Sequence, residues 1–318
     1  MMDDSFVGRR PFHFNRTIPA QQVHDIAIVG RDNSSESMIH LIVAFDALYI
    51  IGVVFLGVIL VTVGRSFHIK RASTWFMFIF SWFLTSLVNL LILGQQTGPQ
   101  PGQGICLLQA TLIYGTPVFA ALYAVAFLLQ VHFSIRNAIM GSSTALSKTQ
   151  VTLIHALPCF SFCAIVIETL TLGLMNPETV ERDPSGMYCH LSSAIPRQVT
   201  AAITIAAMIT FLILGFVVFF KLRRRWQAVR AMSFEKAISQ PQISPDVATR
   251  VLIFSFCPII ALALSSIQYI PHYSADANQL NMILAVLPIV AGLIFGSQRD
   301  ILRAWMNCLQ RKERNCIV

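Results

Sequence analysis

The sequence has few charged residues for its length. Charged residues make up 12% of the 318, whereas hydrophobic residues make up 55% and the mean hydropathy is +0.65. A soluble domain carries about 25% charged residues, so a soluble fold of this size would leave much apolar surface uncovered. The same composition excludes a disordered chain. Seven cysteines are too few for a disulfide-rich scaffold.

The apolar residues are gathered into long uncharged segments. A helix needs about 20 apolar residues to cross the core of a bilayer, and seven segments approach or exceed that length. None of them contains Lys or Arg, and only Asp46 and Glu168 place an acid inside a segment. The seven predicted spans are residues 39–63, 74–93, 105–133, 151–174, 199–220, 251–270 and 280–295.

These segments are apolar on all sides, which favours helices, because transmembrane strands alternate apolar and polar residues. The first 38 residues lack the apolar stretch of a signal peptide, so we expect the first span to direct its own insertion. We therefore predict an all-α membrane protein. An N-terminal tail of residues 1–38 precedes a seven-transmembrane helix bundle of residues 39–296.

The distribution of basic residues predicts the orientation. With the N-terminus outside, the inner segments contain 17 of the 23 Lys and Arg residues, and the outer segments contain six. The positive-inside rule then places the N-terminus outside and the C-terminus in the cytoplasm. The net charge of +8 thus reflects topology and contact with anionic lipid, and it does not indicate a nucleic-acid partner.

Two further features agree with this orientation. Asn15 and Asn33 begin Asn-x-Ser/Thr glycosylation motifs in the N-terminal tail, on the side that the lumenal machinery would reach. Cys106 and Cys189 are the two cysteines of the outer segments, and an oxidising exterior favours a disulfide between them.

Together, these features resemble the G-protein-coupled receptors over nearly the whole chain. Pro258 in the sixth span and Pro288 in the seventh resemble the prolines of that family and would act as hinges. The acidic-Arg-aromatic triplet of the third span and the Asn-Pro-x-x-Tyr motif of the seventh are absent. The junction at residues 295–300 is more similar to divergent orphan seven-transmembrane receptors of fungi.

Residues 297–310 resemble the family's short eighth helix. Apolar residues recur there with a helical period and polar residues take the other side, as in a helix that lies on a membrane surface. Cys308 falls near the apolar side, where it is either a site of S-palmitoylation or a free thiol. Residues 311–318 form the cytoplasmic tail.

The resemblance implies a ligand site between the outer ends of the helices. Polar groups inside spans usually face the bundle, so they are the candidates to bind a ligand. Each could instead form a structural hydrogen bond between helices, which we consider the better interpretation for Asp46. The candidate ligand-binding residues are Gln109, Tyr114, Glu168, Gln268, Tyr269 and Asn281.

The resemblance also implies a heterotrimeric G protein as the cytoplasmic partner. A basic surface would suit an acidic face of such a partner, although the topology rule demands basic inner loops in any case. The candidate contact residues are Arg136, Arg223, Arg224, Arg225 and Arg230.

Four other interpretations compete with this one. A retinal protein would need a lysine in its last span, and none is present. An integral membrane enzyme would cluster its histidines or acids, whereas the eight histidines are scattered without metal-binding spacing, so we predict no enzyme, metal or cofactor. A small-solute transporter and a receptor that does not couple to G proteins stay open as alternatives.

Overall fold

The structure is a computed structural model that describes residues 20–66, 71–140, 147–231 and 277–306. The chain divides into two compact units, Met1–His40 and Leu41–Val318. In the first unit the described residues, 20–40, are helical. Helix α1 begins at Ala20, directly after Pro19, and so extends beyond the predicted span 39–63, which corresponds to the candidate membrane span Met38–Arg65.

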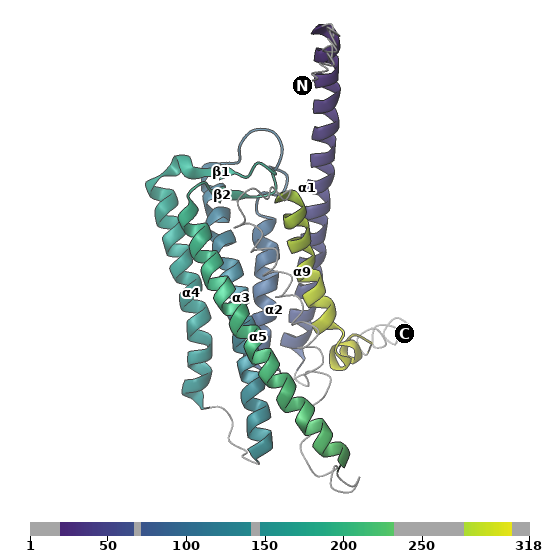
Figure 1. The fold of residues 1–318 in the computed structure, drawn as a ribbon, viewed down its shortest axis with the longest axis vertical. Coiled ribbons are helices and arrows are strands. Elements are labelled where there is room, and N and C mark those ends of the chain that lie inside the picture. The colour runs from purple at the N-terminus through teal and green to yellow at the C-terminus, as the bar shows by residue number, and fades with distance from the viewer. Residues whose placement is uncertain (1–19, 67–70, 141–146, 232–276, 307–318) are drawn as a thin grey trace, which may run out of the picture. The chain divides into compact units, whose positions relative to one another are not determined.

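Helices make up most of the described residues (Figure 1). Five segments are long and apolar enough to cross a membrane, which gives the chain the character of a multi-pass membrane protein. They are Met38–Arg65, Gln103–Asn137, Lys148–Met175, Ala194–Lys221 and Gln279–Gly296. The helices are α1 (Ala20–Arg65), α2 (Ser73–Asn89), α3 (Gln103–Met140), α4 (Lys148–Met175), α5 (Ala194–Ala231) and α9 (Ala277–Gly296).

Two of the seven predicted spans are not among these five. The predicted span 74–93 corresponds to α2, whose 17 residues end at Asn89 and continue as turns to Gly94, where φ is +80°. The predicted span 251–270 lies outside the described residues. The number of seven spans therefore stays a prediction.

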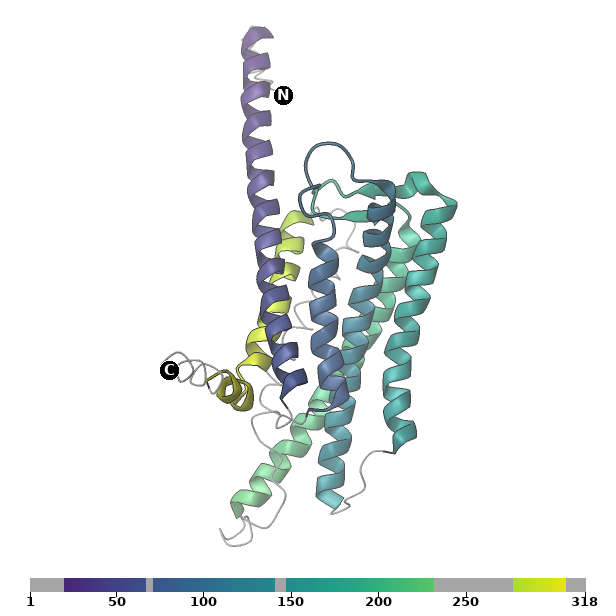
Figure 2. The same cartoon turned by 180° about the vertical axis from the view of Figure 1, so that it is seen from behind.

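Helix α3 packs against α2, α4 and α5, as both views of the fold show (Figures 1 and 2). The largest core cluster includes four aromatic rings contributed by three helices. Phe295 of α9 has its ring centroid 5.5 Å from that of Phe78 of α2 and 6.1 Å from that of Phe127 of α3. The ring centroid of Trp75, also of α2, lies 6.5 Å from that of Phe295, so the Phe295 ring joins α9 to α2 and α3.

The chain between α4 and α5 forms a small antiparallel β-hairpin, which the all-α prediction missed. It consists of β1 (Val180–Arg182) and β2 (Cys189–Leu191), and a single 3-10 turn, Pro177–Thr179, precedes it. Val180 pairs with Leu191 and Arg182 pairs with Cys189. Strands of three residues are too short for a periodic hydrophobic pattern, so hydropathy could not predict them.

We call the end of the bundle that carries this hairpin the hairpin end. Helices α3 and α5 both begin there, because Cys106 is bonded to β2 and α5 follows β2 directly. Their C-terminal ends therefore lie at the opposite end of the bundle. We call it the basic end, after Arg136 of α3 and the basic residues of α5 that begin with Lys221.

The segment predicted as an amphipathic surface helix is helical over residues 299–306. Ile301 is fully buried, and the indole Nε1 of Trp305 donates a hydrogen bond of 2.8 Å to Oγ1 of Thr62 in α1. Asp300 forms a 2.7 Å ion pair with Arg71, just before α2. The segment is thereby fixed to both helices. Residues 307–310, including Cys308, lie outside the described residues.

Candidate functional site at the hairpin end

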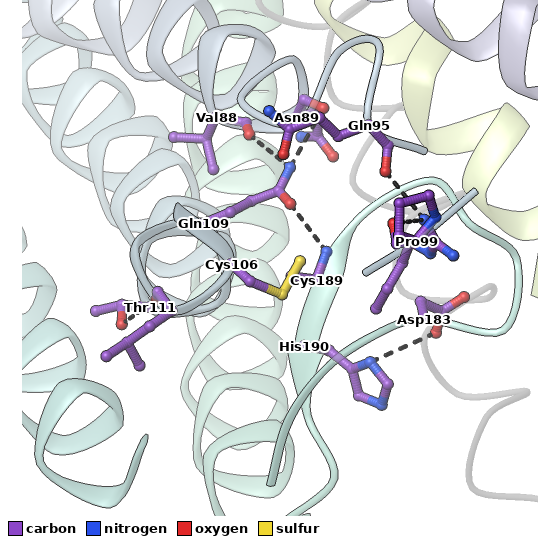
Figure 3. The surroundings of a disulfide bond; sticks show 12 residues. Val88, Asn89, Gln95, Pro99, Cys106, Gln109, Thr111, Asp183, Cys189 and His190 are labelled. Atoms are coloured by element: carbon purple, nitrogen blue, oxygen red, sulfur yellow. Dashed lines mark hydrogen bonds and ion pairs between the residues drawn. A yellow bond between two sulfur atoms is a disulfide. The ribbon is translucent and has the colours of Figure 1, made fainter. Parts of the chain in front are cut away.

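The hairpin is attached covalently to the first turns of α3. The predicted disulfide between Cys106 and Cys189 is present, with 5.3 Å between the two Cα atoms (Figure 3). Both cysteines are buried and pack against Ile92, Val180 and Leu191. The bond therefore holds β2 against the N-terminal part of α3.

Gln109, one turn after Cys106, joins three elements through its side-chain amide. Its Nε2 donates to the carbonyl oxygens of Val88 (3.0 Å) and Asn89 (3.4 Å) at the end of α2. Its Oε1 accepts a 2.9 Å hydrogen bond from the backbone N–H of Cys189 (Figure 3). The side chain is fully buried, so these bonds occupy both atoms that a ligand would need.

Arg182 at the end of β1 fastens the hairpin to the loop between α2 and α3. Its guanidinium donates to the carbonyl oxygens of Gly98 (2.8 Å), Gln95 (3.0 Å) and Pro99 (3.3 Å). Gly98 has a φ of +83°, a conformation that glycine adopts without a steric penalty. Sequence analysis missed Arg182, because its partners are backbone atoms more than 80 residues away.

Asp46 forms the structural hydrogen bond that we preferred for it. Its Oδ1 accepts a 2.7 Å bond from Nε2 of Gln96, and both side chains are buried. The same loop lies against the hairpin turn, since a β-carbon placed on Gly186 would lie 3.0 Å from the carbonyl oxygen of Gln96. The φ of +76° at Gly186 also favours glycine at this position.

Two polar side chains, Tyr114 and Asn281, lie beside Tyr188 of the hairpin. The hydroxyl of Tyr114 on α3 donates a 3.3 Å hydrogen bond to the carbonyl oxygen of Leu191. The phenol of Tyr188 interacts electrostatically with that of Tyr114, and the Asn281 side chain of α9 lies beside it. We call Tyr114, Tyr188 and Asn281 the tyrosine cluster.

Charged residues border the tyrosine cluster. Burial raises the pKa of the Tyr188 phenol, the negative charge of Asp183 raises it further and the positive charge of Arg197 lowers it. The phenol is therefore neutral at physiological pH. The Asn281 side chain is a hydrogen-bonding neighbour of the Tyr188 phenol and lowers its pKa, although its buried Nδ2 atom lies outside ideal hydrogen-bond geometry in the described part of the chain.

Of the predicted ligand-binding residues, Tyr114 and Asn281 thus both lie beside Tyr188. Glu168 is half-buried on α4 and forms no hydrogen bond or ion pair within the described ranges. Its neighbour Ile167 is 62% exposed, as expected on a helix that presents much of its surface to lipid. Gln268 and Tyr269 lie outside the described residues, as do Pro258 and Asn15, and Asn33 lies inside α1.

At the basic end, Arg136, Arg223 and Arg224 have exposed side chains, as a partner surface requires. Arg225 and Arg230 belong to α5, but their side chains are not described. Pro288 lies inside α9, where its Cβ is 3.2 Å from a β-carbon placed on Gly52. The predicted hinge therefore contacts α1 closely.

No protein-family model matches this chain, and no curated protein shows significant similarity to it.

Proposed function

We propose that this chain is a seven-helix receptor of the plasma membrane. It binds an extracellular ligand at the hairpin end and signals through a heterotrimeric G protein at the basic end. The observation that carries the proposal is the tyrosine cluster, which joins the disulfide-bonded hairpin to α3 and α9 through two phenols and one amide. Such convergent polar groups in an apolar bundle are the usual elements of a ligand site.

The proposed orientation places the hairpin end outside the cell. A disulfide between Cys106 and Cys189 persists in an oxidising compartment, which supports an extracellular position. The exposed arginines Arg136, Arg223 and Arg224 lie at the opposite end, where the positive-inside rule puts them in the cytoplasm. The N-terminus is then extracellular and the C-terminus cytoplasmic.

Within the tyrosine cluster, Tyr114, Tyr188 and Asn281 would contact the ligand directly. The phenol rings offer apolar surface with a polar tip, and the Asn281 amide beside Tyr188 offers a hydrogen-bonding group. The Arg197 side chain adds a positive charge that interacts with the phenol of Tyr188. Gln109 has a structural role here, because its amide is already bonded to the backbone.

The coupling of the two ends follows from the helices that connect them. Helix α3 carries Tyr114 near one end and Arg136 near the other, and α9 carries Asn281 and Pro288. A ligand that shifts α3 against α9 would therefore change the arrangement of the basic end, as rigid helices do in two-state receptors.

The test is capture of the detergent-solubilised protein by nucleotide-free G-protein α subunits. We expect capture that GTP reverses, and we expect the Arg223→Glu/Arg224→Glu variant to lose it, because the substitution reverses two exposed charges. The matched control is Arg299→Glu/Arg303→Glu, which makes the same change of charge on the 299–306 segment.

Equal loss in both variants would indicate nonspecific attraction rather than a docking surface on α5. Failure of the wild-type protein to bind any α subunit would contradict the coupled receptor. Solute-flux measurements in liposomes would then distinguish a small-solute transporter from a receptor that does not couple to G proteins.

A further inference from the structure

The basic end contains a contact between two basic side chains, one on α3 and one on α5. Nζ of Lys221 on α5 lies 3.3 Å from Nε2 of His132 on α3. An ammonium group can only donate, so the imidazole accepts at Nε2 and carries its proton on Nδ1. That Nδ1 atom is buried and has no hydrogen-bond partner in the described part of the chain.

Further positive charges surround this contact. Arg136 follows His132 by one helical turn and interacts electrostatically with its ring. Arg224 follows Lys221 by about one turn on α5, and both Arg136 and Arg224 are exposed. Cationic side chains of two helices therefore converge on one place.

No negative charge of these helices balances the cluster. Neither α3 nor α5 contains a single Asp or Glu over its whole length. The described ion pairs lie elsewhere, between Arg71 and Asp300 and around His190 in the hairpin. An anion from outside the chain would remove the repulsion between these groups.

An exposed apolar stripe on α5 ends beside these basic residues. Ile209, Ile213, Phe216 and Phe220 are 49–63% exposed and recur at helical spacing on one face. Arg223 and Arg224 continue that face by one further turn. A ligand with hydrocarbon chains and an anionic head would match the stripe and the charges at once, whereas a free phosphate would use the charges alone.

We propose that Lys221, Arg224 and Arg136, with His132 holding the lysine in place, bind the phosphate of an anionic phospholipid whose acyl chains lie along this stripe. The site lies between the ends of α3 and α5, at the depth where the span Ala194–Lys221 ends. Basic pockets between transmembrane helices recognise lipid headgroups in this way. The inference requires that the helices cross a membrane and does not depend on a G-protein partner.

The experiment is native mass spectrometry of the full-length protein in neutral detergent, titrated with dioleoyl-phosphatidylglycerol or dioleoyl-phosphatidylcholine. We expect the first bound phosphatidylglycerol to dissociate from Lys221→Gln/Arg224→Gln about 100-fold more readily than from the wild type. Each charged hydrogen bond to a phosphate contributes about 1.5 kcal/mol or more, which is roughly tenfold in affinity. Binding of the zwitterionic lipid should change little.

The matched control is Arg299→Gln/Arg303→Gln, which removes the same charge from exposed positions of the 299–306 segment. It should change the affinity about fivefold or less, as screened surface charges do. The swap Lys221→Arg/Arg224→Lys keeps both charges and should keep the bound lipid. Melting temperatures would show that every variant is folded.

Equal losses in the test and control variants would overturn the site, because they would show only diffuse attraction. Inorganic phosphate provides the second arm of the experiment. If phosphate protected the protein against thermal unfolding as well as phosphatidylglycerol does, the apolar stripe would contribute nothing and the ligand would not be a lipid.

Discussion

Gln109 shows what a single buried amide does at the hairpin end. It satisfies two carbonyl groups at the end of α2 and one N–H group of β2, which all lie beyond the reach of water. A buried polar group that loses its partner costs about 1–3 kcal/mol, which is more than the bond itself contributes. The Gln109 side chain therefore connects α3 to both α2 and β2.

This role predicts the effect of Gln109→Leu. The substitution keeps the volume but leaves the Cys189 N–H and the Val88 carbonyl unpaired, so we expect a loss of about 2–4 kcal/mol of stability. A fall of several degrees in the melting temperature of the detergent-solubilised protein should report it. Gln103→Leu is the control, because Gln103 is exposed and makes one 3.3 Å bond to Pro177. Equal melting temperatures for the two variants would refute the structural role.

Gln109 also shows the limit of prediction from sequence. An uncharged polar residue inside a span is equally consistent with a ligand contact and a bond between helices. Its partners, Val88, Asn89 and Cys189, bond through backbone atoms, so the types of their side chains do not reveal the contact. Tyr114 and Asn281 were predicted as candidates, but Tyr188, which joins them, lies outside every apolar segment and was missed.

At the scale of elements, α1 and α9 approach each other closely through glycine. A β-carbon placed on Gly292 would lie 2.7 Å from Cδ1 of the Phe55 ring, and one on Gly296 would lie 2.7 Å from Cδ1 of Ile59. Small residues permit such contacts in membranes, where packing rather than the hydrophobic effect drives helix association. The close apolar contact between α1 and α9 therefore depends on glycine, which has no β-carbon, at these positions of α9.

We expect Gly292→Ala to destabilise the protein by about 1–2 kcal/mol, because overpacking outweighs the gain of about 1 kcal/mol in helix propensity. The control is Gly64→Ala in α1, where nothing lies within 4 Å of the added carbon. That variant should be neutral or more stable. Thermal unfolding of the two variants and of Gly292→Ala/Phe55→Leu would test this. If Phe55→Leu fails to restore stability, the proposed clash is not the cause.

Prediction of elements succeeded where length and hydropathy decide the structure. The apolar runs located α4 and α9 to within three residues, whereas α3 continues from the predicted end at residue 133 to Met140, and α5 begins five residues earlier and continues through its basic C-terminal end. The hairpin escaped prediction because its strands, VER and CHL, contain three residues each. Its geometry depends on the distant contacts of Arg182 and on the disulfide.

At the scale of the whole molecule, the two ends of the unit Leu41–Val318 differ in chemistry. The hairpin end has a disulfide and the half-buried phenols of the tyrosine cluster, and the basic end has exposed arginines on helices without acids. The proposed topology assigns these ends to opposite sides of the membrane. This assignment is the premise of both binding proposals and can be tested without any ligand.

Labelling with a membrane-impermeant maleimide tests the topology in intact cells. Glu178→Cys introduces a thiol at an exposed position of the hairpin end, and we expect it to react without permeabilisation. Ser134→Cys introduces one at an exposed position near the basic end, and we expect it to react only after permeabilisation. The unsubstituted chain gives the background from its own thiols. The reverse pattern would exchange the two sides and remove the basis of the G-protein proposal.

The bond between Cys106 and Cys189 has a consequence for the order of assembly. The two cysteines are 83 residues apart, and the whole of α4 lies between them. During synthesis, Cys106 cannot form this bond until α4 and the hairpin have followed it. A chain arrested before that point would expose Cys106 to the wrong partner, so oxidising enzymes and the insertion machinery must act in sequence on this protein.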